Sequence, residues 1–164
     1  MEPIKVLYSL ILLLSLHGSL NPRPIDSQTE SKPEWKYLVT SEDHNQVWKT
    51  YYDVKNIKRK SEGTIEVWLK QVPITKTEEE RQRIIRSIIK NRELNEMPIK
   101  GYGKFAYSLT LIEFDCSKKV GRRVSIKDYN EAGELLGTDT IEGVPFAPVP
   151  EGSMAGVVLE AVCK

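Results

Sequence analysis

The stretch FAYSLTLIEFDC, residues 105–116, decides how the rest of the chain is expected to fold. It contains no Gly or Pro and is rich in Phe, Tyr, Leu, Ile and Thr, a composition typical of a well-packed strand. We therefore expect it at the centre of a sheet. Its last residue, Cys116, is one of only two cysteines, and the other, Cys163, is the penultimate residue. A disulfide between them would tie the central strand to the C-terminus.

The apolar pattern of this strand changes phase part-way along. The odd-numbered residues from Phe105 to Leu111 share one face, whereas Ile112, Phe114 and Cys116 share the other. Because side chains alternate strictly along a strand, the pattern predicts either a β-bulge near Leu111 and Ile112 or cover on both faces.

Three more strands are expected before the central one. Residues 35–39 and 47–53 are predicted to form a hairpin across the polar loop 41–45. Residues 64–72 alternate, which indicates a half-buried antiparallel strand. Ile65, Val67 and Leu69 face one way, and Thr64, Glu66, Trp68 and Lys70 face the other.

A helical period interrupts these strands. Thr77 and Glu80 form a capping box, and isoleucines at 84, 85, 88 and 89 make an apolar stripe. The helix is expected over residues 78–95, because Pro98 cannot continue its hydrogen bonds. Its basic residues are Arg81, Arg83, Arg86, Lys90 and Arg92.

Residues 120–129 and 134–140 predict a second hairpin around the turn 130–133. Ser153 is an expected N-cap for a helix over residues 154–163. The predicted fold class is α+β: an antiparallel β-sheet of about six strands, with one inserted amphipathic helix and a C-terminal helix tethered to the sheet by a disulfide between Cys116 and Cys163.

The N-terminal region differs from the rest. Residues 6–16 carry no charge, follow Lys5 and lead into small and polar residues, so residues 1–20 are predicted to be a signal peptide. A buried helix or a membrane anchor is the alternative, but an anchor needs about 20 apolar residues. Residues 21–33 are expected to be a flexible arm and residues 34–164 the folded domain. Export would favour the disulfide, and no transmembrane anchor is expected after processing.

The search for reactive groups predicts no enzyme. Outside the signal peptide the only histidine is His44, so no His-rich zinc site or Cys–His pair can form. The segment 101–106, GYGKFA, matches a dinucleotide fingerprint, but it follows a helix and opens a strand, the reverse of what that motif requires. Glu113 and Asp115 share one strand face, where we expect them to pair with nearby basic groups. No catalytic, cofactor or metal site is predicted.

Basic residues supply the candidate binding surface. It comprises Arg81, Arg83, Arg86 and Lys90 of the helix, with Lys118, Lys119, Arg122 and Arg123 after the central strand. A further basic cluster is Lys55, Lys58, Arg59 and Lys60. Together they would suit sulfated glycans or acidic protein surfaces, with ordinary surface charge as the alternative. The net charge of +1 and the lack of aromatic residues among these clusters predict no nucleic-acid partner.

Several segments, in this order, resemble the bacterial surface-adhesin protein E family. They are Trp35, Tyr51-Tyr52-Asp53, Val67-Trp68-Leu69-Lys70, Ile112-Glu113-Phe114-Asp115-Cys116, Tyr129-Asn130-Glu131-Ala132-Gly133, Val149-Pro150-Glu151-Gly152-Ser153 and Val162-Cys163-Lys164. The chain departs from the family pattern at Phe146, where the family usually has Trp, and in lacking a lipid-anchor cysteine. No binding residue is carried over from the family.

The resemblance implies an exported, non-enzymatic binding protein located in the periplasm or on the outer surface of a Gram-negative bacterium. Its expected partners are host extracellular-matrix or serum proteins, and it is a possible homodimer. One alternative is a periplasmic structural or accessory protein of the cell envelope with no host ligand. Another is a small hydrolase or an enzyme inhibitor.

Overall fold

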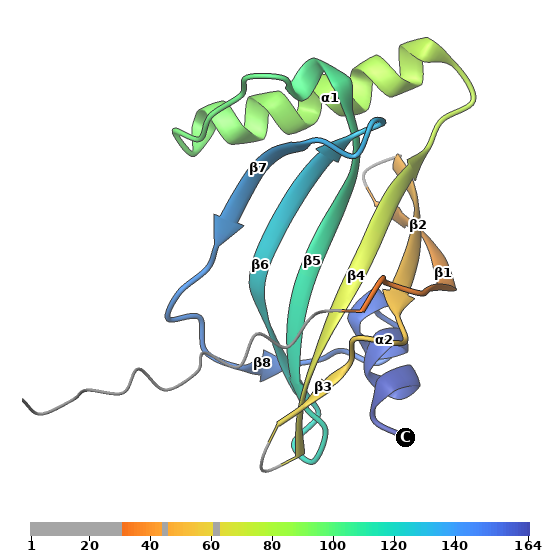
Figure 1. Ribbon diagram of the computed structural model, residues 1–164, viewed down its shortest axis with the longest axis vertical. Coiled ribbons are helices and arrows are strands. Elements are labelled where there is room, and N and C mark those ends of the chain that lie inside the picture. Colours follow the sequence, from red (N-terminus) through yellow and green to blue (C-terminus); the bar gives the residue numbers. More distant parts are fainter. Residues whose placement is uncertain (1–30, 44–45, 61–62) are drawn as a thin grey trace, which may run out of the picture.

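The computed structural model describes residues 31–43, 46–60 and 63–164. In this part of the chain, eight strands form one antiparallel sheet together with two α-helices and one short 3₁₀-helix (Figure 1). The elements are β1 Trp35–Asp43, β2 Gln46–Asp53, β3 Lys58–Arg59, β4 Thr64–Ile74, α1 Glu78–Leu94, η2 Tyr102–Lys104, β5 Phe105–Asp115, β6 Val120–Asn130, β7 Leu135–Thr140, β8 Ala147–Pro148 and α2 Met154–Val162.

The strand order confirms the expected architecture. Six strands run in the order β1-β2-β4-β5-β6-β7, and the short β3 and β8 pair with β4 and β6. The strand at residues 105–115 lies between β4 and β6, as predicted for the centre of the sheet. The first hairpin also forms, but β1 continues to Asp43, through part of the segment expected to be a loop.

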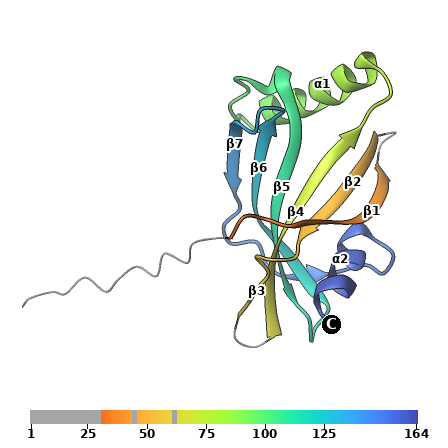
Figure 2. The same cartoon turned by 45° about the vertical axis from the view of Figure 1, so that its right-hand side comes forward.

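The two helices occupy different positions on the sheet. α1 lies across one end of the strands, whereas α2 lies over one face near the other end (Figures 1 and 2). We call the side of the sheet that contacts α2 the helix face and the other side the open face. Ile65, Val67 and Leu69 of β4 belong to the helix face, so Trp68 and Lys70 belong to the open face.

The helix face holds two separate apolar clusters. The larger one joins Val158, Leu159 and Val162 of α2 to the sheet through residues such as Val67 and Phe114. The smaller one joins α1 to η2 and β5 through Ile85, Tyr102 and Phe105. Between the clusters runs a row of polar residues from four neighbouring strands, paired in register: Thr50, Gln71, Ser108 and Asp128.

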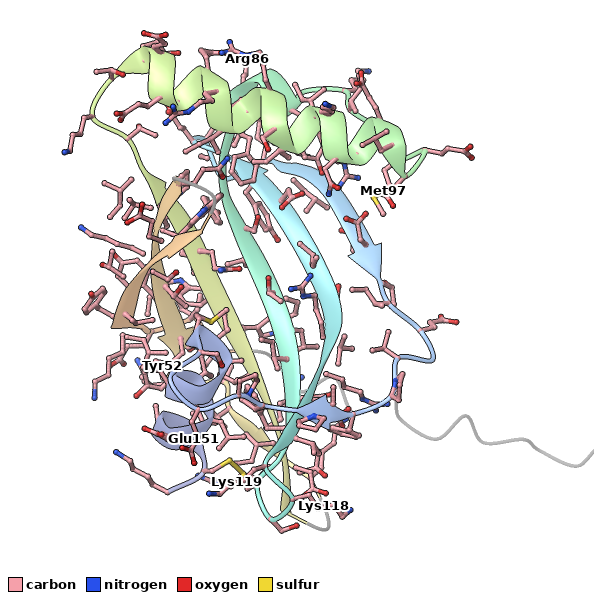
Figure 3. All side chains as sticks on the ribbon, turned by 180° about the vertical axis from the view of Figure 1, so that it is seen from behind. Tyr52, Arg86, Met97, Lys118, Lys119 and Glu151 are labelled. Atoms are coloured by element: carbon pink, nitrogen blue, oxygen red, sulfur yellow. A yellow bond between two sulfur atoms is a disulfide. The ribbon has the colours of Figure 1, made fainter. Side chains whose placement is uncertain are left out.

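A disulfide between Cys116 and Cys163 joins the end of β5 to the end of α2. The two residues are 47 positions apart in sequence, and Figure 3 shows the bond in yellow beside the C-terminal helix. The prediction that a disulfide clamps the C-terminal helix to the sheet is therefore confirmed.

The irregularity expected in the central strand is present in its pairing. The register between β5 and β6 shifts between Leu111 and Ile112, and the extra residue is Val124 of β6. β5 itself pairs with β4 without interruption, so its apolar residues lie on both faces of the sheet. The register shifts a second time at Ala106. Because of this shift, Phe105 is buried with α1 and does not share a face with Tyr107, so the prediction that these two residues lie on one face was wrong.

The expectations for residues 1–30 lie outside the described residues. These include the signal peptide and most of the arm predicted over residues 21–33. Within the part that the structure describes, no helix is long and apolar enough to cross a membrane.

Candidate binding site

On the open face, a cross-strand row that contains two lysines lies between rows that contain aromatic residues. The middle row contains Lys70, Leu109 and Lys127, which are direct neighbours on β4, β5 and β6. Tyr107 and Tyr129, themselves paired, lie in the row nearer α1. Trp68 lies on the opposite side of the middle row. Because residues two apart on a strand point the same way, all these side chains share one surface.

Each lysine of the middle row lies over an aromatic ring. Lys70 Nζ is 4.2 Å from the ring centroid of Tyr107 and 6.0 Å from that of Trp35. Lys127 Nζ is 4.9 Å from the ring centroid of Trp68. These distances fall in the range of cation–π attraction. The rings therefore hold two ammonium groups close to the sheet.

The tyrosines of the neighbouring row are packed against each other. The rings of Tyr107 and Tyr129 are stacked, with centroids 5.1 Å apart and planes 11° apart. Burial, with Tyr129 beside it, raises the pKa of the Tyr107 hydroxyl, which is therefore neutral at physiological pH. Tyr107 contributes an uncharged ring under Lys70.

A groove of about 290 Å³ opens between these rings. Its apolar lining includes Trp35, Trp68, Leu109 and Tyr129. Its charged lining residues are Lys32, Asp53 and Lys127. One rim is formed by residues 31–33, just before β1. We call this surface, with Lys70 beside it, the aromatic–lysine groove.

The polar groups at the rim are already hydrogen-bonded to one another. Asp53 accepts from the backbone N–H groups of Glu34 and Lys55, at 3.0 and 3.1 Å, and from Asn56 Nδ2 at 2.6 Å. Ser31 Oγ donates to Asn56 Oδ1 at 2.9 Å, and Asn56 Nδ2 donates to the carbonyl of Ser31. These bonds hold residues 31–34 beside the groove and leave the rim few polar groups for a ligand.

The charges of the groove differ from those nearby. Lys70 and Lys127 pair with no carboxylate in the described part of the chain. Farther along the same face, Glu113 accepts from Arg122 Nε at 2.6 Å and from Lys60 Nζ at 3.1 Å. Burial opposes ionisation of Glu113, but these bonds outweigh it and lower its pKa. Lys60 also pairs with Glu66 at 2.6 Å, so that network has two cations and two carboxylates. In the groove, Lys32, Lys70 and Lys127 outnumber the single carboxylate of Asp53, and the groove is positive.

The predicted basic residues do not form one patch. α1 lies at one end of the sheet, and Lys118 and Lys119 lie at the other, as Figure 3 shows with Arg86 labelled on the helix. Arg83, Arg86, Lys90, Lys119 and Arg123 are exposed. Three other members are engaged within the protein: Arg81 pairs with Glu131, Lys118 with Asp115 and Arg122 with Glu113.

Arg92 does not belong to the solvated basic side of the helix. It is only 5% exposed and donates to Asp139 Oδ2 at 2.9 Å and to Asp128 Oδ2 at 3.4 Å. Tyr102 and Ser108 also donate to Asp128, at 2.9 and 2.6 Å. This network fixes the C-terminal end of α1 to β6 and β7, and it is structural.

The opposite face has a larger groove of about 720 Å³, beside the N-terminus of α2. Its lining includes Trp48, Gln71 and Arg123. No rings stack with lysines there, and its Ser108 and Ser153 hydroxyls already donate to Asp128 and to the carbonyl of Pro150. In the described residues, no three His, Cys, Asp or Glu side chains come together as a metal site.

The aromatic–lysine groove was not among the predicted sites. Part of it could have been found in residues 64–72, because the alternation there places Trp68 and Lys70 on the face opposite the apolar one. The other members come from β1, β5 and β6, and only the strand pairing brings them together. Chemically, the groove offers flat apolar rings and two ammonium groups held over rings, a combination suited to binding.

Comparison with known proteins gives one family. The model of the surface-adhesin protein E family matches residues 35–164. No curated protein and no solved structure matches the chain.

Proposed function

The chain belongs to the surface-adhesin protein E family, and on that premise we propose that it binds host extracellular-matrix or serum proteins from the outer surface of a Gram-negative bacterium. Membership of this family indicates an exported or cell-surface protein that binds without catalysis. The host ligand and the surface location are the parts that we propose.

The observation that carries the proposal is the aromatic–lysine groove. Aromatic side chains bury large areas on binding and dominate the energetics of interfaces. On the open face, β4, β5 and β6 present Trp68, Tyr107 and Tyr129 with two lysines between them. A surface of this composition would suit a ligand that carries negative charge.

Binding to immobilised matrix and serum proteins tests the host-ligand part. We expect the purified protein to bind at least one member of such a panel. Lys70→Gln with Lys127→Gln should weaken that binding, because it removes two positive charges of the groove that pair with no carboxylate in the described residues. The matched control is Arg86→Gln with Lys90→Gln, which removes the same charge from exposed positions on α1. Equal losses in the two double variants would contradict the groove as the contact surface.

Protease treatment of intact cells tests the location. A surface protein is expected to be cleaved while a periplasmic marker survives. Complete protection, in cells whose known surface proteins are cleaved, would favour a periplasmic accessory role with no host ligand.

A further inference from the structure

We propose that the aromatic–lysine groove binds an anionic polysaccharide, a chain of pyranose rings carrying sulfate or carboxylate groups. This inference rests on the proposed adhesin function and names the ligand class of the same site. It follows from the positive charge of the groove, from the positions of its two ammonium groups and from the shortage of polar groups that are free to bond a ligand.

The charge is positive and fixed in place. Lys70 and Lys127 have ring partners at 4.2 and 4.9 Å and no carboxylate partner in the described residues. A lysine that is free in solvent loses side-chain entropy when it binds an anion. Because the rings already restrict these two side chains, part of that loss has occurred before the ligand arrives.

The spacing of the charges suits an extended chain. Lys70 and Lys127 flank Leu109 on three adjacent strands. Their ammonium groups lie over different rings: that of Lys70 over Tyr107, in the row nearer α1, and that of Lys127 over Trp68, on the other side of the middle row. A polymer with repeated charges can meet both ammonium groups.

The shortage of free hydrogen-bonding groups favours sugar rings over an acidic peptide. A peptide brings a backbone donor and acceptor with almost every residue, and these need partners when water is excluded. At this groove the groups of Asp53, Asn56 and Ser31 are already bonded to each other. A pyranose ring can place its apolar C–H face on Trp35, whose nearest ammonium group is the most distant of the three contacts, at 6.0 Å, while its hydroxyl and anionic groups point outward.

The arrangement of the rings disfavours single-stranded nucleic acid, which binds by stacking bases on bare aromatic faces. Here Tyr107 and Tyr129 stack on each other, and ammonium groups lie over Tyr107 and Trp68. Few bare faces are left for successive bases. An anionic group needs access to the ammonium instead.

Calorimetric titration with a heparin-derived octasaccharide tests the proposal. We expect binding that weakens as salt is raised, because exposed charges are screened. Lys70→Gln with Lys127→Gln should weaken it about tenfold, and Arg86→Gln with Lys90→Gln less than about twofold. Trp35→Ala should weaken it about fivefold without changing the salt dependence, because it removes a ring and no charge. Circular dichroism checks that each variant is folded.

Three probes of other chemistry complete the titration: an uncharged octasaccharide that has been desulfated, N-acetylated and carboxyl-reduced, an octaglutamate peptide and an oligothymidylate. Absence of octasaccharide binding would overturn the proposal, as would equal losses in the two double variants. Tighter binding of the peptide or of the oligonucleotide would assign the groove to that ligand instead. Tight binding of the uncharged chain would leave a sugar site and overturn the role of the charges.

A separate measurement distinguishes this inference from the adhesin function. Matrix proteins are presented before and after enzymatic removal of their glycosaminoglycan chains. Binding that survives this treatment and the Lys70 and Lys127 substitutions would overturn the polysaccharide ligand while leaving adhesion in place. If the protein binds the octasaccharide but no host protein, the proposed adhesin function is wrong and the proposed ligand class of the groove still stands.

Discussion

Asp115, the last residue of β5, shows how single residues set the acid stability of the fold. Its carboxylate accepts from Ser117 Oγ at 2.6 Å and from the backbone N–H of Lys118 at 3.1 Å. The hydrogen bond from the Ser117 hydroxyl, with those from Lys118, holds the pKa of Asp115 well below its usual range. Its stabilising effect is therefore present above the ordinary carboxyl pKa and is lost as the pH falls through the folded-state value.

We expect Asp115→Asn to lower the free energy of unfolding at pH 7 and to matter less in acid. As the pH falls from 5 toward 2, Asp115 takes up a proton in the unfolded chain while it stays ionised in the folded protein, because its folded-state pKa is lowered. This proton uptake favours unfolding of the wild type, whereas the uncharged amide of the variant does not titrate. Urea unfolding at pH 7, 5, 4 and 3 measures the difference. A difference between the two proteins that stays constant over this range would contradict the role assigned to Asp115.

Arg92 is expected to be the most sensitive basic residue of α1. Arg92→Leu leaves the buried Asp128 and the half-buried Asp139 without their cation, and breaking a buried pair such as Arg92–Asp128 costs about 3–5 kcal/mol. Arg86→Leu on the same helix is the control, because a substitution at an exposed position usually changes stability by less than about 0.5 kcal/mol. Chemical denaturation measures the free energy of unfolding of both variants. If the two variants lose similar amounts of it, the network around Arg92 does not stabilise the fold.

At the scale of the elements, the disulfide determines how firmly α2 is held. The helix has only nine residues, and its three valines are β-branched residues that weaken helix propensity. Closing a loop between residues 47 apart is worth about 4 kcal/mol on the chain-entropy estimate. α2 therefore depends on the bond as well as on its buried face.

Replacing both cysteines by serine should lower the free energy of unfolding by about 2–5 kcal/mol. Hydrogen exchange should then accelerate most in α2, because the helix loses its covalent attachment to β5. Denaturant unfolding and exchange mass spectrometry, compared with the oxidised wild type, measure the two effects. Uniform acceleration across all strands would contradict a local role for the clamp.

Elements with a strong local signal were predictable from the sequence. Thr77 does cap α1 and accepts from the backbone N–H of Glu80, and Ser153 caps α2 in the same way. What the local pattern could not give was the partner of each side chain. Arg92 lies seven residues after Ile85 and so continues the isoleucine stripe of the helix, but its carboxylate partners are supplied only by the approach of β6 and β7. Phe105 changes face because of a pairing shift at Ala106, which depends on β6.

The groove was hidden for a related reason. Trp35, Trp68 and Tyr129 are 33 or more residues apart along the chain and belong to strands whose order had to be known first. Alternation predicts which side of its own strand a residue occupies. It does not predict which rings on other strands will be its neighbours, so a site composed of cross-strand neighbours emerges only from the register.

At the scale of the whole molecule, the two helices stabilise opposite ends of one sheet through separate apolar clusters. The polar row between them contains Thr50, whose hydroxyl is fully buried and has no partner in the described residues. Buried polar side chains between the two clusters stabilise the fold less than buried apolar side chains would, because burying a polar group costs free energy. The two ends are therefore coupled mainly through the strands, and not through one continuous core.

This arrangement predicts that the ends can open independently. Ile85→Ala removes a buried side chain from the cluster under α1 and should destabilise that end by about 2–5 kcal/mol. Native-state hydrogen exchange at low denaturant should then show lower protection in α1 and η2, whereas α2 and the adjoining parts of β4 and β5 keep theirs, because locally cooperative units exchange separately. Val158→Ala is the reciprocal variant, which should release α2 before α1. If either substitution lowers protection equally at both ends, the sheet and its two clusters unfold as one unit, and the polar row does not separate them.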